Sequence, residues 1–296
     1  MSLLTSFKNR IKTFTIDRHP NIFRPSSKPY LSGDSLRKYA NFIFDETQSF
    51  NPNDVRENDI IFVKTDLKDI YFQHYHNKIT SRYILITHNS DVSIEKDDLK
   101  YLDAKIKHWF AAKLNTHSNN QLSPMAYGLE NQRYLKNGRI KIFKKVEKEV
   151  NIENKIEKIF CSFNTYTNPP EREPLMDLAK NNETLFSVKH FSNNYKYLTE
   201  LSKYSFNLCP EGNNFESHRI WESLNFKVTP IVLNNIVNNN FFNLGIPLLL
   251  IDSWSDLKEM TIEDLNKLNS VNIGKDYQKF CRLDFWTKEI QKQIGQ

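Results

Sequence analysis

The residues best suited to chemistry in this sequence are Arg219 and Glu222, which lie three positions apart. Apolar residues at Ile220, Trp221 and Leu224 recur near the 3.6-residue period of a helix, so we expect a helix with Arg219 and Glu222 on one face. A turn-rich loop precedes it, and the free N–H groups and dipole at the start of a helix favour an anion such as phosphate. A cation and a carboxylate one turn into this helix fit the pyrophosphate and the ribose of a nucleotide.

Each of these side chains also has a structural interpretation. Arg219 would pair bidentately with phosphate oxygens and offset charge on a leaving group, or else form an ion pair with Glu216 or Glu222 on its own helix. Glu222 would accept hydrogen bonds from ribose hydroxyls, or serve only in an ion pair. Ser217 would donate to a phosphate, or only cap the helix.

The loop and the strands around this helix complete a larger unit. The loop at 210–214 contains Glu211, which could contact sugar hydroxyls or lie exposed at the surface, and Gly212. An apolar run at 206–209 precedes the loop, and a β-branched run at 228–233 follows the helix. Strand, glycine-containing loop, helix and strand form the βαβ unit of a parallel sheet.

Strand and helix signals alternate along most of the chain. Strands are expected at 28–32, 59–63, 82–87, 109–112, 123–127, 159–163, 185–188, 206–209, 228–233 and 247–251. Helices are expected at 36–43, 67–75, 97–104, 136–157, 171–178, 195–202, 220–224, from 261 onward, and at 276–294. Repeated alternation of this kind predicts parallel sheets that are covered on both faces.

The length and pattern favour two domains. We expect an α/β fold with two doubly wound, Rossmann-like domains, 1–150 and 151–275, and a helix at 276–296 that packs back on the first domain. In such sheets ligands bind outside the carboxyl ends of the strands, in this case in a cleft between the two domains. The polar clusters that end strands lie at 88–91, 128–131, 164–172 and 210–214.

Composition excludes several classes of protein. The net charge is +6 with a pI near 9.0, but the lysines are spread along the chain and no zinc-finger spacing, aromatic RNA-binding motif or basic-region heptad is found, so no nucleic-acid partner is expected. Three distant cysteines indicate neither a disulfide framework nor a metal motif, and favour a cytoplasmic location. His74 and His76 are two residues apart and would diverge on a helix, which argues against a metal site.

The N-terminal segment has neither the apolar core of a signal peptide nor a membrane-spanning run, so we expect a soluble protein. Its apolar residues have amphipathic spacing, with flanking Lys and Arg: Leu3, Leu4, Phe7, Ile11 and Phe14. This set would either dock on the protein's own domain or make the protein peripheral to a membrane.

Residues 206–232, FNLCPEGNNFESHRIWESLNFKVTPIV, resemble the signature of exostosin-type glycosyltransferases. That signature runs from a strand ending in Cys-Pro through a glycine loop and Ser-x-Arg-x-x-Glu-Ala to a Gly-x-x-Pro-Val strand. The matching positions are Cys209, Pro210, Gly212, Ser217, Arg219, Glu222, Pro230, Ile231 and Val232. Ser223 replaces the usual Ala and Lys227 the usual Gly. Weaker similarity to bacterial or viral relatives is found at 32–35, 87–91 and 163–172.

The resemblance implies a GT-B architecture, with a nucleotide-sugar donor on the C-terminal half, an acceptor on the N-terminal half, and no catalytic metal or other cofactor. The expected function is transfer of a sugar, favouring a UDP-sugar, to a hydroxyl of a glycan, lipid-linked or protein acceptor, as in polysaccharide biosynthesis. A non-catalytic sugar- or nucleotide-binding partner protein of the same fold is the alternative. The absence of G-x-G-x-x-G and G-K-[ST] runs argues against a dehydrogenase or a P-loop NTPase.

Transfer with inversion needs a base that accepts the proton of the acceptor hydroxyl. Asp91 and, as second choice, His88 follow the clearest strand of the N-terminal half, although the same residues would suit a helix-capping turn. On the donor side, Arg172 is expected as a second phosphate contact and Asn164 as part of the donor loop.

Overall fold

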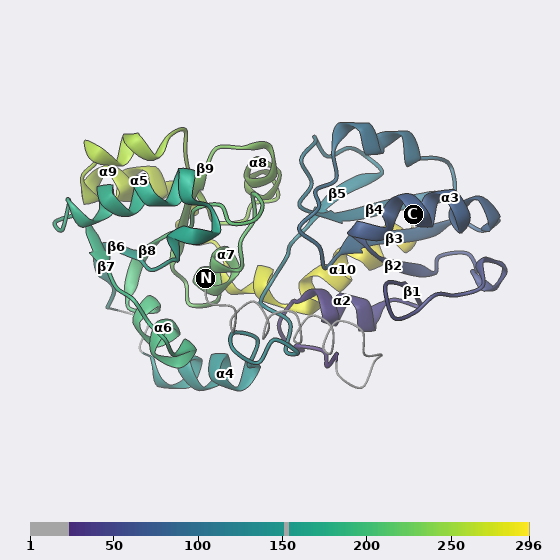
Figure 1. Ribbon diagram of the computed structural model, residues 1–296, viewed down its shortest axis with the longest axis horizontal. Coiled ribbons are helices and arrows are strands. Elements are labelled where there is room, and N and C mark those ends of the chain that lie inside the picture. Colours follow the sequence, from purple (N-terminus) through teal and green to yellow (C-terminus); the bar gives the residue numbers. More distant parts are fainter. Residues whose placement is uncertain (1–23, 151–153, 296) are drawn as a thin grey trace.

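The computed structural model describes residues 24–150 and 154–295. Figure 1 shows two lobes, each built around a parallel, five-stranded sheet. The first sheet contains β1 Phe42–Phe44, β2 Ile60–Lys64, β3 Tyr83–His88, β4 Ile106–Ala112 and β5 Leu122–Met125. The second contains β6 Ile156–Cys161, β7 Phe186–Val188, β8 Tyr204–Leu208, β9 Thr229–Leu233 and β10 Leu249–Ile251. The predicted α/β fold of two Rossmann-like domains in a GT-B-like arrangement is confirmed.

The two sheets differ in the order of their strands. The first follows the chain, β1-β2-β3-β4-β5, whereas the second is ordered β10-β9-β8-β6-β7. In the second sheet β7 therefore lies on one side of β6 and β8 on the other, and Ile159 of β6 is in register with Phe206 of β8. Ligands of open α/β sheets bind outside the carboxyl ends of the strands at such a reversal, so the fold itself marks the region beyond β6 and β8.

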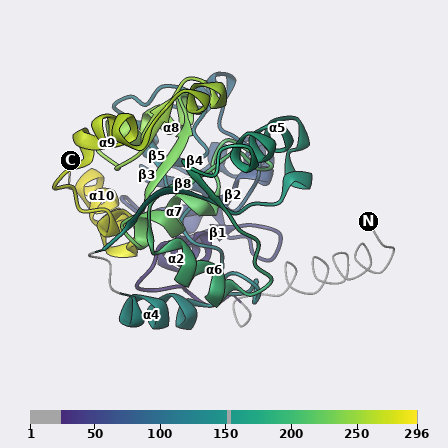
Figure 2. The same ribbon diagram turned by 90° about the vertical axis from the view of Figure 1, so that its left-hand side faces the viewer.

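The helices cover both faces of the two sheets. They are α2 Gly33–Tyr39, α3 Lys68–His74, α4 Ile140–Glu149, α5 Pro169–Lys180, α6 Asn194–Leu201, α7 His218–Asn225, α8 Ile236–Asn243, α9 Ile262–Asn269 and α10 Leu283–Ile294. Viewed from the side, as in Figure 2, α4 and α6 lie next to each other at one end of the molecule. The chain between the two sheets contains α4.

One apolar core is shared by the two domains. It includes Leu36 of α2, Phe62 of β2, Trp221 of α7 and Trp286 of α10, all buried. Helix α10 contacts β3 and β4 of the first sheet, and Figure 1 shows it crossing from the second lobe to the first. Because apolar burial drives domain docking, this shared core holds the two lobes in a defined relation.

Several segments form another kind of secondary structure than the one predicted. Residues 28–32 form only isolated bridges, from Tyr30 to Arg282 and from Ser32 to Gly128. The helix expected to bury Phe42 or Ile43 ends at Tyr39, because Ala40 has an extended backbone, and Phe42–Phe44 instead forms an edge strand paired with β2. Residues Lys96–Tyr101 form a 3-10 helix.

Helix α8 was missed by the sequence analysis. Its residues IVNNNFFN contain three consecutive asparagines, which have low helix propensity. The side chain of Asn235 accepts a hydrogen bond from the backbone N–H of Asn238 and so caps the helix, while Val237 and Phe241 are buried. Capping and burial together offset the unfavourable propensity.

Candidate donor site

A polar cleft of about 780 Å³ lies between the two domains. Of the predicted donor-binding residues, six line it: Asn164, Arg172, Gly212, Ser217, Arg219 and Glu222. Asp91 lines it from the opposite domain. Ser162, directly after β6, also lines the cleft, which therefore opens at the strand reversal of the second sheet.

Arg172 of α5 organises the loops on the donor side of the cleft. Its Nε donates to the carbonyl of Glu211 at 2.6 Å, Nη1 to that of Asn164 at 2.9 Å, and Nη2 to that of Pro210 at 3.3 Å. Its side chain is buried, and burial, with the charge of Arg219, lowers its pKa to about 10. Arg172 thus joins the loop after β6 to the loop after β8; because it also lines the cleft, its role as a phosphate contact stays a prediction.

Two polar side chains at the start of α7, Ser217 and Arg219, have few protein partners. Ser217 occupies the N-cap position but makes no capping hydrogen bond, and its Oγ is buried without any partner among the described residues. Arg219 donates through Nε to the carbonyl of Ser162 at 3.2 Å. In the part of the chain that the structure describes, Arg219 has no ion pair within 4 Å, with Glu216 and Glu222 included. The structural interpretations of Ser217 as a cap and of Arg219 as an ion-pair partner therefore do not hold.

Glu222 lies one turn further along α7, at the wall of the cleft. The hydroxyl of Tyr197 donates to its Oε2 at 3.0 Å. The residue is only 6% exposed, and burial raises the pKa of its carboxyl despite the charge of Arg219. A carboxyl group held in this way can accept a hydroxyl hydrogen bond from a ligand.

The loop residues of the donor side have different environments. Asn164 is exposed in the cleft. Gly212 borders it where a β-carbon would lie 3.3 Å from Nη2 of Arg172, so even alanine would press on that guanidinium. Glu211 does not line the cleft: its Oε1 accepts from Asn235 at 2.9 Å. The prediction that Glu211 contacts a donor sugar is therefore corrected.

Asp91 connects the two domains. Lys113 donates to its Oδ1 at 2.7 Å, and Asn213 from the second domain donates to Oδ2 at 3.1 Å. Burial raises the pKa of this carboxyl, but the hydrogen bond from Lys113 and the charge of that residue more than offset it, so the pKa is below its usual value. Asp91 is thus an ionised bridge whose two oxygens both have partners.

His88 is buried beneath the cleft and does not line it. The backbone N–H of Asn89 donates to its Nδ1 at 2.7 Å, and its Nε2 donates to the carbonyl of Ala126 at 3.2 Å. Burial lowers its pKa to about 4. Because both ring nitrogens have partners, the prediction of His88 as a second-choice base is corrected to a structural role.

Three residues that line the cleft at the domain junction had no predicted role: Tyr127, Glu216 and His218. His218 occupies the variable position between Ser217 and Arg219 in the resemblance, so the pattern assigned it nothing. Its Nδ1 lies 2.7 Å from the carbonyl oxygen of Gly128 in the first domain. Glu216 accepts from the backbone N–H of Tyr127 at 2.6 Å. No local pattern could reveal these contacts, because they depend on how the domains dock.

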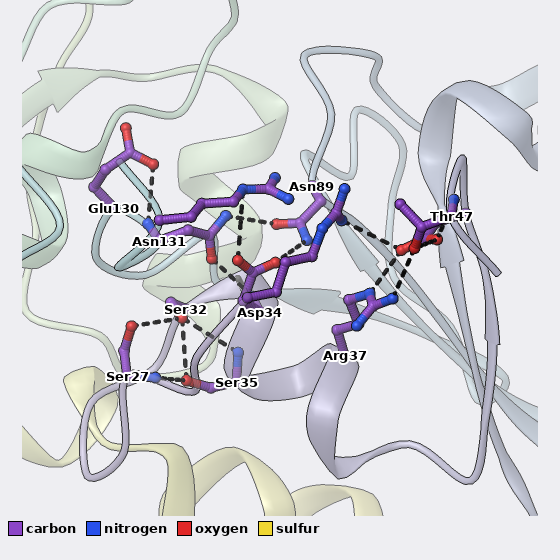
Figure 3. Close-up of polar contacts among 12 residues, drawn as sticks. Ser27, Ser32, Asp34, Ser35, Arg37, Thr47, Asn89, Glu130 and Asn131 are labelled. Atoms are coloured by element: carbon purple, nitrogen blue, oxygen red, sulfur yellow. Dashed lines mark hydrogen bonds and ion pairs between the residues drawn. The ribbon is translucent and has the colours of Figure 1, made fainter. Parts of the chain in front are cut away.

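A polar network, drawn in Figure 3, includes Asn89 and Asn131, which line the cleft from the first domain. Asn131 accepts from the backbone N–H of Asp34 at 2.7 Å and donates to Asn89 at 3.0 Å, and Asn89 donates to Asp34 at 3.0 Å. Burial raises the pKa of Asp34. This network fixes the loop that contains Glu130, whose Oε1 accepts from the backbone N–H of Asn131 at 2.9 Å.

Within 24–150 and 154–295, no three His, Cys, Asp or Glu side chains are grouped so that they could hold a metal ion. No helix in those ranges has the length and apolarity that crossing a membrane requires. The amphipathic set between Leu3 and Phe14 lies outside the described residues.

Comparison with known proteins finds similarity among solved structures. No protein-family model matches the chain, and neither does any curated protein. Among solved structures, the chain is similar to α,α-trehalose 6-phosphate synthase from Burkholderia multivorans, with 10% sequence identity and a TM-score of 0.43 over 81% of this chain and 72% of that one. The resemblance to the exostosin type stays a prediction.

Proposed function

We propose that this protein is a glycosyltransferase that takes a sugar from a nucleotide-sugar donor and transfers it to a hydroxyl. The single observation that carries the proposal is the arrangement of Ser217 and Arg219 at the strand reversal of the second sheet. A buried hydroxyl without a partner and a guanidinium without an ion pair, together at the start of a helix, form a site for a diphosphate.

The roles of the donor-side residues follow from their contacts. Arg219 keeps its terminal nitrogens for phosphate, and its charge would stabilise the diphosphate as it leaves. Glu222, one helical turn away, would accept from the ribose hydroxyls through the oxygen that Tyr197 does not occupy. Arg172 and Gly212 would shape the loop that covers the diphosphate. We expect the guanidinium charge to serve in place of a divalent cation, so nucleotide binding should withstand EDTA.

The donor and acceptor are proposed at the level of chemical class. A UDP-sugar is the favoured donor, and a glycan, a lipid-linked glycan or a protein hydroxyl is the acceptor. The acceptor would enter from the first-domain side, where Asn89, Asn131 and Tyr134 line the cleft with amide and phenol groups suited to sugar hydroxyls.

The test is thermal stabilisation by nucleotides. UDP, GDP and CDP and their common sugar conjugates are added in turn, and the apparent Tm is measured for the parent protein and for Arg219→Ala. We expect one nucleoside diphosphate to raise the Tm, and Arg219→Ala to weaken its Kd roughly 10- to 100-fold, since a hydrogen bond to a charged group contributes about 1.5–3 kcal/mol.

Arg139→Ala is the matched control, because Arg139 is an exposed arginine beside α4 that does not line the cleft. It should bind nucleotide like the parent. If no nucleoside diphosphate changes the Tm, the proposal is wrong.

A non-catalytic nucleotide-binding protein of the same fold is the second candidate. The observation that favours it is the state of the two predicted bases, since His88 is buried and Asp91 is held by Lys113 and Asn213. Release of nucleoside diphosphate distinguishes the transferase from the binding protein. A transferase releases nucleoside diphosphate from its sugar conjugate, whereas a binding protein leaves the conjugate intact.

A further inference from the structure

His218 presents one defined nitrogen to the cleft. A carbonyl oxygen can only accept, so the 2.7 Å contact between Nδ1 and the oxygen of Gly128 requires the proton to be on Nδ1. In the neutral ring, Nε2 then carries the lone pair. The side chain is 27% exposed and lines the cleft, so a ligand can approach it.

A carboxylate lies beside that nitrogen. Oε2 of Glu130 is 3.6 Å from Nε2 of His218, and the other oxygen of Glu130 is fixed by the backbone N–H of Asn131. Figure 3 shows Glu130 and Asn131 joined to the network of Asn89 and Asp34. A carboxylate in this position stabilises the imidazolium that forms when Nε2 takes up a proton.

His218 and Arg219, which are neighbours in the same turn of α7, contact different domains. Arg219 contacts the carbonyl of Ser162, after β6 of the second domain. His218 contacts Gly128, after β5 of the first domain. Arg219, the proposed contact for the leaving group, thus lies on the side of the second domain, where the donor is proposed to bind. The imidazole of His218 lies on the side of the first domain, where the acceptor is proposed to enter.

We propose that Nε2 of His218 is the general base that accepts the proton of the acceptor hydroxyl. This inference rests on the proposed function. It transfers to His218 the role that the sequence predicted for Asp91, whose oxygens are both engaged by Lys113 and Asn213. Glu130 acts as a positioning residue through His218.

The step balances without another reactant. The acceptor O–H bond breaks, its proton moves to Nε2, and the oxygen forms a bond to the anomeric carbon. The bond from that carbon to the donor phosphate breaks, and its electron pair leaves on the diphosphate, next to Arg219. The products are a glycoside, a nucleoside diphosphate and a proton held by His218.

The geometry also makes the base depend on both domains. The ring belongs to α7, but its Nδ1 partner, Gly128, and its charge partner, Glu130, belong to the loop after β5. The ring of Tyr127 lies 4.8 Å from the imidazole ring, centroid to centroid, and restricts it further. The imidazole is therefore aligned only when the two domains are docked.

The experiment uses His218→Asn, because the amide nitrogen of Asn reproduces the Nδ1–H donor to Gly128 but offers no basic Nε2. Release of nucleoside diphosphate is measured with the sugar nucleotide that most raises the Tm of the parent, and water serves as the acceptor. We expect the rate to fall by about 100-fold or more, as for loss of a general base, while the Tm shift by nucleotide persists. His74→Asn removes an exposed histidine outside the cleft and should match the parent.

A second variant separates a base from a structural role. His218→Ala opens space for free imidazole. Added imidazole should raise the rate of nucleoside diphosphate release by this variant at least about tenfold, whereas a merely structural defect would not respond to imidazole. A release rate in His218→Asn within threefold of the parent overturns the inference and leaves the proposed function standing. Loss of the Tm shift in His218→Asn makes His218 a donor contact and also overturns it.

Two further outcomes concern the parent protein. If nucleotide raises the Tm of the parent but no nucleoside diphosphate is released from any sugar conjugate, the protein is the non-catalytic candidate and His218 is no base. If it shows no stabilisation by any nucleotide, the proposed function fails first and the inference fails with it.

Discussion

The backbone N–H of Tyr127 donates to Oε1 of Glu216 across the domain junction, at 2.6 Å. The indole N–H of Trp221 donates to the same oxygen at 2.7 Å. The other oxygen, Oε2, is buried without a hydrogen-bond partner among the described residues. One carboxyl group therefore joins the domains and is left half-satisfied, and its protonation should affect their docking.

The first prediction concerns the pH dependence of stability. Burial raises the pKa of Glu216 to about 7, against the lowering effects of Tyr127, Lys113, Trp221 and His218. The folded state then holds a proton that the unfolded state loses above its usual carboxyl pKa of about 4.5. The contribution of Glu216 to stability should fall as the pH rises through this window, by at most about 1.4 kcal/mol per pH unit, and stay constant above pH 7.

Glu216→Gln isolates that contribution, since the amide oxygen can still accept from Tyr127 and Trp221 but cannot ionise. We expect the variant to gain stability relative to the parent as the pH is raised from 5 to 7, measured as the difference in apparent Tm at each pH. A difference that does not vary with pH would show that Glu216 does not titrate in this range.

The second prediction concerns Arg172. Its guanidinium donates to carbonyls of Asn164, Pro210 and Glu211, so removing it takes the donor from three loop acceptors, of which that of Pro210 is buried. Arg172→Ala should destabilise the protein by about 2–5 kcal/mol, measured by urea unfolding, and should weaken nucleotide binding by loosening the loops.

Arg172→Lys is the informative comparison, because a single ammonium on a flexible stem cannot reach three carbonyls in a fixed plane. It should recover less than half of the lost stability. Full recovery by lysine would mean that charge, not the planar fork, is what Arg172 contributes.

The sequence predicted the second-domain side of the cleft better than the first-domain side. The positions of Arg219 and Glu222 at the cleft could be predicted, because a helical period, a glycine loop and two strands are all local signals. The loop contacts of Arg172 could not, because its acceptors are backbone carbonyls, which leave no trace in residue type. His88 was misassigned for a similar reason: residue type and strand position do not reveal that both ring nitrogens have partners inside the fold.

The fold, too, could be predicted only where its signals are local in the sequence. Long apolar strands such as β3 were recognisable from composition, but β1 was not, since three residues in an edge strand resemble the end of a helix. The strand order of the second sheet and the docking of His218 on Gly128 depend on contacts between distant segments. Sequence periodicity carries no information about such contacts.

The third prediction concerns Gly33, at the start of α2. A β-carbon there would lie 1.8 Å from Oδ1 of Asn89 and 2.5 Å from Nδ1 of His88. Asn89 cannot turn away without losing its bonds to Asp34 and Asn131. Gly33→Ala should therefore destabilise the protein by about 1–3 kcal/mol in urea unfolding.

Gly295→Ala is the matched control, because the nearest atoms to its added β-carbon lie 4.0 Å away. It should change the free energy of unfolding by less than about 0.5 kcal/mol. Equal stability of the two variants would mean that the loop with Asn89 adapts to the added methyl group.

The fourth prediction concerns Asp91 and separates its bridging contacts from catalysis. Asp91→Asn removes the ion pair with Lys113, whose side chain is only 1% exposed, but an amide can still contact Asn213. We expect a loss of about 1 kcal/mol in stability, unchanged nucleotide affinity, and a fall of less than about tenfold in nucleoside diphosphate release, because His218 supplies the base. A fall of more than about 100-fold with intact nucleotide binding would return the catalytic role to Asp91 and remove it from His218.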